Sequence, residues 1–213
     1  MEASNYKGMF MKFILLLSSL LFLTNCSSGS SGSDQQASPM PPSNGNFTNQ
    51  YNQIPVGAVL QSSTSCFSYN NPNTVVEGNF YKLTIHKGSS SSWDLVVENF
   101  STNDCSGNSL MTIAWLKDVN SVDTTSSTSN TLNLSLFDVQ YNIKSQSVLD
   151  VYNSVPMFGK SWLLNQLESV INLKATPQDT GPTHIKNTLS TTIIQVFPNS
   201  KRVLVGNVEF FYQ

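Results

Sequence analysis

The 213-residue chain contains few charged residues: Asp, Glu, Lys and Arg together make up 11% of it, and the formal net charge is −2. It has no basic block, so binding to the phosphates of nucleic acids has no electrostatic support. Small polar residues are abundant instead, with 33 Ser, 17 Thr and 23 Asn. This composition is typical of β-strands joined by polar turns and argues against a helix-rich cytosolic enzyme.

Long hydrophobic runs are also missing. The longest one covers residues 13–23 and is shorter than the roughly 20 residues that span a membrane. Lys7 and Lys12 precede it, and a short apolar run after positive charges is typical of a signal peptide. We therefore predict a signal peptide over residues 1–25, with Met11 as an alternative start to Met1.

The end of this segment, Leu23-Thr24-Asn25-Cys26, resembles the lipobox of bacterial lipoproteins, with Asn25 where Gly, Ala or Ser is usual. The resemblance implies that Cys26 carries fatty acyl chains such as palmitate, becomes the mature N-terminus and anchors the protein to a membrane. By the same resemblance, Ser27 implies sorting to the outer membrane of the cell envelope. The alternative is an ordinary secretory signal that happens to contain a cysteine.

Residues 26–53 consist mainly of Ser, Gly, Asn, Gln and Pro with almost no aliphatic side chains. This composition predicts a lipidated, flexible tether. The globular domain is then expected to cover residues 54–213 and to fold without the tether, because the tether offers little apolar surface to bury.

Cysteine is scarce, with three residues in the whole chain. If Cys26 carries lipid, Cys66 and Cys105 remain as an even pair in an oxidising compartment, and we predict a disulfide bond between them. In the chain-entropy model such a bond would stabilise the fold by about 4 kcal/mol. Two buried free thiols are the alternative. A zinc site is less favoured, because neither cysteine has a second ligand at the usual spacing.

Several segments have strand-like patterns and are separated by turn signals. The expected strands cover residues 56–69, 79–87, 93–100, 110–117, 132–145, 188–197 and 202–212, with a further short strand at 148–152. The apolar phase changes within residues 132–145, which predicts a β-bulge or a bend. Residues 162–172 are ambiguous: their apolar spacing would suit a short helix, and a strand is the alternative.

About eight antiparallel strands in one domain predict an all-β barrel or sandwich. Cys66 in the first strand, followed after two strands by the turn Asn103-Asp104-Cys105, resembles secreted and envelope domains with a lipocalin-like barrel. The lipocalin Gly-x-Trp signature is absent, since the corresponding stretch is Gly57-Ala58-Val59. The resemblance implies a lipocalin-like β-barrel of about eight strands.

Motifs of catalysis are lacking too. The two histidines, His86 and His184, have no spaced metal partner and no nucleophile motif, and both are expected to be solvated. We therefore predict no enzyme activity, no catalytic or metal residues and no cofactor. The expected function is a non-catalytic module that binds a lipid or another apolar molecule. The alternative is a structural or protein-interaction lipoprotein of the envelope, in which side chains fill the barrel interior.

Overall fold

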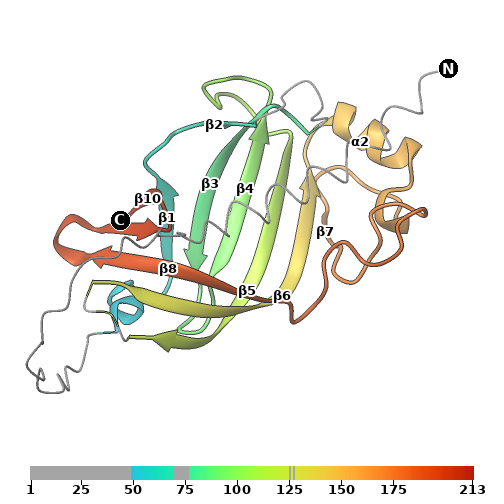
Figure 1. The fold of residues 1–213 in the computed structure, drawn as a ribbon. Coiled ribbons are helices and arrows are strands. Elements are labelled where there is room, and N and C mark those ends of the chain that lie inside the picture. The colour runs from blue at the N-terminus through green and yellow to red at the C-terminus, as the bar shows by residue number, and fades with distance from the viewer. Residues whose placement is uncertain (1–48, 70–76, 125, 127) are drawn as a thin grey trace, which may run out of the picture.

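A computed structural model of the chain describes residues 49–69, 77–124, 126 and 128–213 (Figure 1). The predicted signal peptide, Cys26 and most of the predicted tether lie outside these residues. The described elements, in chain order, are the 3₁₀ helix η1 (Gln50–Gln53), β1 (Ala58–Ser62), β2 (Phe67–Ser68), β3 (Phe80–Lys87), β4 (Asp94–Phe100), β5 (Met111–Asp123), β6 (Asn130–Ile143), α2 (Gln146–Ser154), η3 (Met157–Gly159), β7 (Leu167–Ser169), β8 (Leu189–Phe197), η4 (Pro198–Ser200), β9 (Arg202–Val205) and β10 (Val208–Tyr212).

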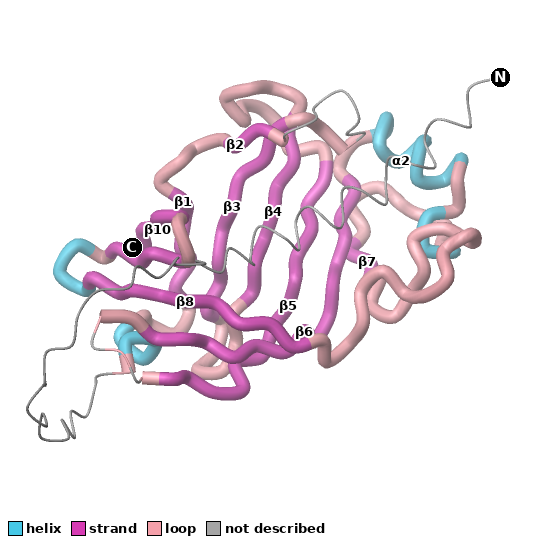
Figure 2. The backbone as a smooth tube through the Cα atoms, in the orientation of Figure 1, coloured by secondary structure: helices cyan, strands magenta, loops and turns pink. Residues whose placement is uncertain are grey.

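Eight of the strands form a closed antiparallel barrel. Their order is β1-β10-β9-β8-β6-β5-β4-β3, and β3 pairs with β1 to close the ring. Strand β2 pairs with β3 and β7 pairs with β6, outside the ring. The strands, drawn as magenta tubes in Figure 2, curve around one interior. The predicted all-β lipocalin-like barrel of about eight strands is confirmed at the level of architecture.

The longest strand pair, β5 and β6, contains the predicted bulge. Leu116 pairs with Asp138 but Lys117 pairs with Leu136, so Phe137 is an extra residue on β6. This extra residue explains the change of apolar phase along the strand, because Leu136 before it and Val139 after it are both buried and face inward. Phe137 itself is half exposed. Beyond the bulge β6 also changes its second partner, from β8 at its beginning to β7 at its end.

The helix prediction was wrong in position. The described α-helix is α2, where a short strand was predicted, and it buries Val148, Leu149 and Tyr152 along one face. Residues 162–173 instead contain turns and β7, and Asn165 and Asn172 adopt left-handed backbone conformations with φ of 59° and 58°. A helix cannot continue through such residues. The leucines whose spacing suggested a helical core face, including Leu163 and Leu167, are exposed.

The predicted last strand, residues 202–212, is two strands. β9 and β10 form a tight hairpin around Gly206, whose φ of 57° is readily adopted by glycine. The first predicted strand, residues 56–69, is likewise divided into β1 and β2.

A close approach of backbones occurs at Gly78 (φ 121°), where a Cβ atom would lie 2.4 Å from the carbonyl oxygen of Phe100.

Candidate ligand-binding site

Helix η1 closes one end of the barrel. The Lys87 ammonium donates hydrogen bonds to the carbonyl oxygens of Tyr51 (2.7 Å) and Ile54 (2.8 Å), and it lies 3.8 Å from the centre of the Tyr51 ring. From β6, the buried Asn130 Oδ1 accepts hydrogen bonds from the backbone N–H groups of Gln50 and Tyr51. These contacts join η1 to two strands of the wall and seal this end.

The packing of the barrel therefore begins before the expected domain boundary at residue 54. Tyr51 is 2% exposed and belongs to the same core cluster as Leu60, Leu132 and Phe210 from the barrel strands. A single tyrosine among polar residues gives no periodic signal. Its role emerges only from the buried partners that the fold places around it.

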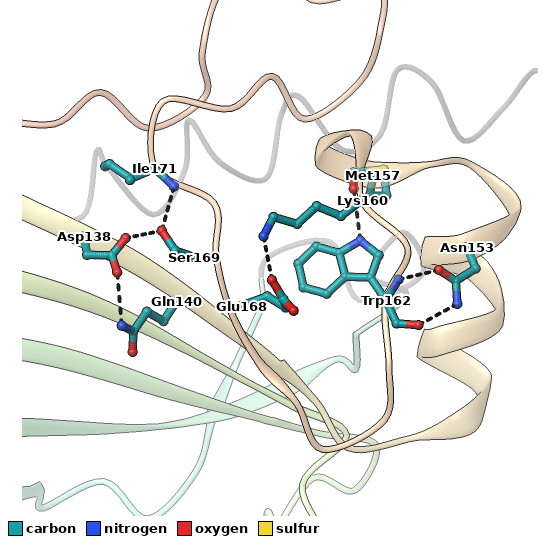
Figure 3. A network of polar contacts seen from close by, with 9 residues as sticks. All are labelled: Asp138, Gln140, Asn153, Met157, Lys160, Trp162, Glu168, Ser169 and Ile171. Atoms are coloured by element: carbon teal, nitrogen blue, oxygen red, sulfur yellow. Dashed lines mark hydrogen bonds and ion pairs between the residues drawn. The ribbon is translucent and has the colours of Figure 1, made fainter.

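Helix α2 and the segment after it cover the opposite end of β5 and β6, away from η1 (Figure 1). Trp162, 2% exposed, donates its indole N–H to the Met157 carbonyl (2.9 Å), and its backbone exchanges two hydrogen bonds with the Asn153 side chain (Figure 3). Nearby, Lys160 pairs with Glu168, and Ser169 donates a hydrogen bond to Asp138 on β6. This network fixes the segment between α2 and β7 on the barrel.

The inward side chains between these two ends differ in how deeply they are buried. Close to η1, Leu60, Leu132 and Ile194 are fully buried. Further along the interior, three apolar side chains retain intermediate exposure: Leu83, Leu95 and Trp115.

The orientation of these three residues follows from the strand register. Leu83 pairs with the fully buried Val97, and Trp115 pairs with the fully buried Val139. Leu95 pairs with Trp115, so all three share the inward face. An inward side chain can be reached by solvent only where the interior is unfilled or open.

Lys117 lies on the same face, two residues beyond Trp115 on β5. Its Nζ comes within 3.5 Å of Ser190 Oγ on β8, which requires the side chain to cross β6. It crosses on the face of the buried Leu134 and Leu136, and this face is the interior. Burial lowers the pKa of Lys117 from its ordinary value.

His184 lies beside this interior region and is 8% exposed, so the expectation that it is solvated was wrong. Its ring centre is 6.4 Å from those of Trp115 and Tyr141. Its Nε2 atom is buried and has no hydrogen-bond partner in the part of the chain that the structure describes, and burial lowers the pKa of the imidazole to about 4. The other histidine, His86, is partly exposed and pairs with Asp94 across β3 and β4.

A second buried polar group lies near α2. Glu77 is 3% exposed and accepts a hydrogen bond from the Tyr152 hydroxyl (2.7 Å). Burial raises the pKa of this carboxyl, and the hydrogen bond from Tyr152 opposes part of the increase. On the neighbouring strands, the Tyr69 hydroxyl donates to Asn99 Oδ1. These polar groups lie among the apolar side chains at this end, away from Lys87 and η1.

Cys66 and Cys105 form a disulfide bond, with their Cα atoms 5.4 Å apart. The bond joins the segment before β2 to the turn after β4, on the outside of the ring. Cys105 has a left-handed backbone (φ 51°) and is 1% exposed, so the tight turn holds its sulfur against the protein. The predicted pairing is confirmed, whereas Cys26 lies outside the described residues.

Within the described ranges, no group of three or more His, Cys, Asp or Glu side chains could hold a metal ion. The same residues contain no helix long and apolar enough to cross a membrane. The segment Phe158-Gly159-Lys160-Ser161 packs against α2, where Phe158 is buried and Lys160 is paired with Glu168.

Comparison with known proteins identifies no matching family model and no matching curated protein. The function must therefore be inferred from the barrel interior itself. Sequence reasoning missed Lys117 and His184 as interior residues. For Lys117 a signal existed, because it continues the alternation of Ile113 and Trp115 in a predicted strand.

Proposed function

We propose that the protein is a lipoprotein of the bacterial envelope, anchored to the outer membrane through Cys26, whose barrel binds an apolar small molecule without catalysis. Exposure of the inward side chains Leu83, Leu95 and Trp115 is the observation that carries the ligand-binding part. Small-molecule sites are usually concave, mostly apolar and lined with a few polar groups. A barrel closed at one end by η1 and left accessible beyond it fits this description.

The ligand-binding part can be tested with a neutral fluorescent probe, N-phenyl-1-naphthylamine, added to residues 27–213. These residues include the whole closed barrel and its core, so they should fold as a unit. We expect saturable binding of about one probe per chain. Leu83→Trp should reduce the affinity at least about tenfold, because the larger side chain fills the accessible space.

The matched control for that test is Leu204→Trp, at a partly exposed position of β9 whose neighbour Val203 faces the core. It should leave binding unchanged. Absence of saturable binding, or equal loss in both variants, would contradict ligand binding in the interior.

The anchor is supported by the lipobox resemblance around Cys26 and by the disulfide between the other two cysteines, a bond favoured in an oxidising compartment. In a bacterial host, the wild-type chain should partition with membranes and show the mass of attached acyl chains. Cys26→Ser should remove both, and Cys66→Ser should leave the acyl mass in place. An unchanged mass in the Cys26→Ser protein would refute the anchor.

A second candidate is an interaction lipoprotein that engages another envelope protein. The observation favouring it is a set of large apolar side chains on the outer surface, among them Leu189 (72% exposed), Leu163 (61%) and Ile185 (55%). If the neutral probe does not bind, this candidate becomes the preferred one.

A further inference from the structure

The Lys117 ammonium lies inside the barrel and has no carboxylate partner among the described residues. The ion pairs among the described residues are Lys144–Glu98, Lys160–Glu168 and Arg202–Glu209. Lys117 is in none of them, and its one side-chain hydrogen bond is the long contact to Ser190 Oγ at 3.5 Å. A cation removed from water without a counter-charge is unfavourable. The barrel therefore maintains a local positive charge that its own side chains do not neutralise.

Lys87 also faces inward, and its ammonium group has its hydrogen bonds satisfied. Lys87 has two carbonyl acceptors at 2.7 and 2.8 Å and the Tyr51 ring against it. All of these partners come from residues 51–54, so Lys87 has a clear structural role. Lys117 has no comparable set of partners.

A second unsatisfied polar group lies on the same side of the interior. The Nε2 atom of His184 is buried and has no hydrogen-bond partner within the described ranges, and the imidazole packs edge-on against Trp115. Trp115 is two residues from Lys117 on the same face of β5, so the two polar groups flank one aromatic side chain. Buried polar atoms are usually paired, and an unpaired one calls for an explanation such as a ligand.

We propose that the ligand is an amphiphile with a long apolar chain and an anionic head group such as a carboxylate. Its head group would bind Lys117 Nζ and Ser190 Oγ, and its chain would lie against Leu83, Leu95 and Trp115. This inference rests on the proposed binding of an apolar molecule in the barrel and adds the charge of the ligand and the position of its head group.

The test compares two ligands that differ in the head group, hexadecanoate and hexadecanol, by equilibrium dialysis with residues 27–213. The wild-type protein should bind the anion roughly ten- to a hundredfold more tightly than the alcohol, as expected for hydrogen bonds to a charged group. Lys117→Met should remove that preference by weakening hexadecanoate, with hexadecanol unchanged. Lys117→Arg should restore most of it.

Lys186→Met is the matched control, because Lys186 is exposed and lies over the half-exposed ring of Phe137. It should preserve the preference for the anion. The comparison of the two ligands on the wild-type protein needs no variant, so it stands even if Lys117→Met fails to fold.

The outcomes separate this inference from the proposed function. If both ligands bind equally well, or if Lys117→Met and Lys186→Met have the same effect, the assignment of an anionic head group is overturned and apolar binding stands. If neither ligand binds, the proposed function itself fails.

Discussion

At the scale of single residues, Lys117 and His184 are polar side chains in positions that packing alone would give to apolar ones. Both are beside Trp115, and His184 Nε2 has no partner among the described residues. Proteins tend to break local packing rules at functional sites and to lose some stability there. Placing these groups inside the barrel should lower its free energy of unfolding, and the decrease can be measured at each position.

The first prediction concerns Lys117. Replacing it with Met should raise the free energy of unfolding by about 1 kcal/mol, because the replacement removes a partly buried charge that has no counter-charge. Urea denaturation of the ligand-free protein at pH 7 would measure the change. Lys186→Met, at an exposed position, should stay within about 0.5 kcal/mol of the wild type. A loss of stability in Lys117→Met larger than in the control would mean that the ammonium is well satisfied.

The second prediction concerns His184. Its folded-state pKa of about 4 lies below the ordinary value of 6.5, so the unfolded chain binds more protons between these values. Stability contributed by the neutral imidazole is therefore present above pH 6.5 and is lost as the pH falls toward 4. Between pH 7 and pH 5 the loss should be about 2 kcal/mol.

His184→Phe should abolish that loss in denaturation series at pH 7, 6 and 5. The control is His86→Gln, which should retain the wild-type slope, since His86 is partly exposed on the strand surface. An equal change in stability from pH 7 to pH 5 in the wild type and in His184→Phe would contradict the burial of His184, and this comparison excludes the opposite contribution of Glu77, whose pKa burial raises.

At the scale of elements, the short helix η1 makes a large contribution to the packing and hydrogen bonding of one barrel end. It comprises four residues, yet it supplies the buried Tyr51 and one of the two carbonyl acceptors of Lys87. The disulfide acts at the same scale, since it ties β2 to the turn after β4 without taking part in the ring. Each of these elements can be removed separately.

Deleting η1 should be costly, in contrast to the expectation from composition. A protein starting at residue 54 should lose about 3 kcal/mol relative to one starting at residue 48, because Lys87 loses its Tyr51 acceptor, Asn130 loses both of its donors and the Tyr51 ring is removed. Its thermal midpoint should fall by roughly 10 °C. Equal midpoints in circular dichroism would show that η1 does not close the barrel.

Removing the disulfide should also lower stability. The bond closes a loop with a sequence separation of 39, so Cys66→Ala with Cys105→Ala should cost about 4 kcal/mol. Reduction of the wild-type protein under the same denaturing series should give a similar decrease. The double variant should be insensitive to the reductant, and a decrease in both proteins would assign the effect to another cause.

The elements also show how far sequence reasoning extends. Alternation predicted β3, β4 and β8 to within one residue, because each has one inward and one outward face. It also predicted the bulge at Phe137. It failed for α2 and for residues 162–173, where the exposure of Leu163 and Leu167 depends on tertiary packing rather than on spacing. The role of Tyr51 was not predictable either, since its partners Lys87 and Asn130 are distant in sequence.

At the scale of the whole molecule, the barrel combines a sealed end with an accessible interior. The core near η1 is tightly packed, a second core joins α2 to β5 and β6, and the accessible apolar side chains lie between them. A barrel of eight strands can be filled by its own side chains or can hold one small ligand. The partial exposure of Leu83, Leu95 and Trp115 favours the second arrangement.

The most direct test of this account is quenching of Trp115 by a brominated fatty acid, 9,10-dibromostearate, because bromine quenches indole fluorescence only at short range. We predict saturable quenching in residues 27–213, and its loss in Trp115→Phe, which retains the buried Trp93 and Trp162. Equal quenching in the two proteins, or no saturation in the wild type, would contradict the claim that an apolar ligand binds inside the barrel.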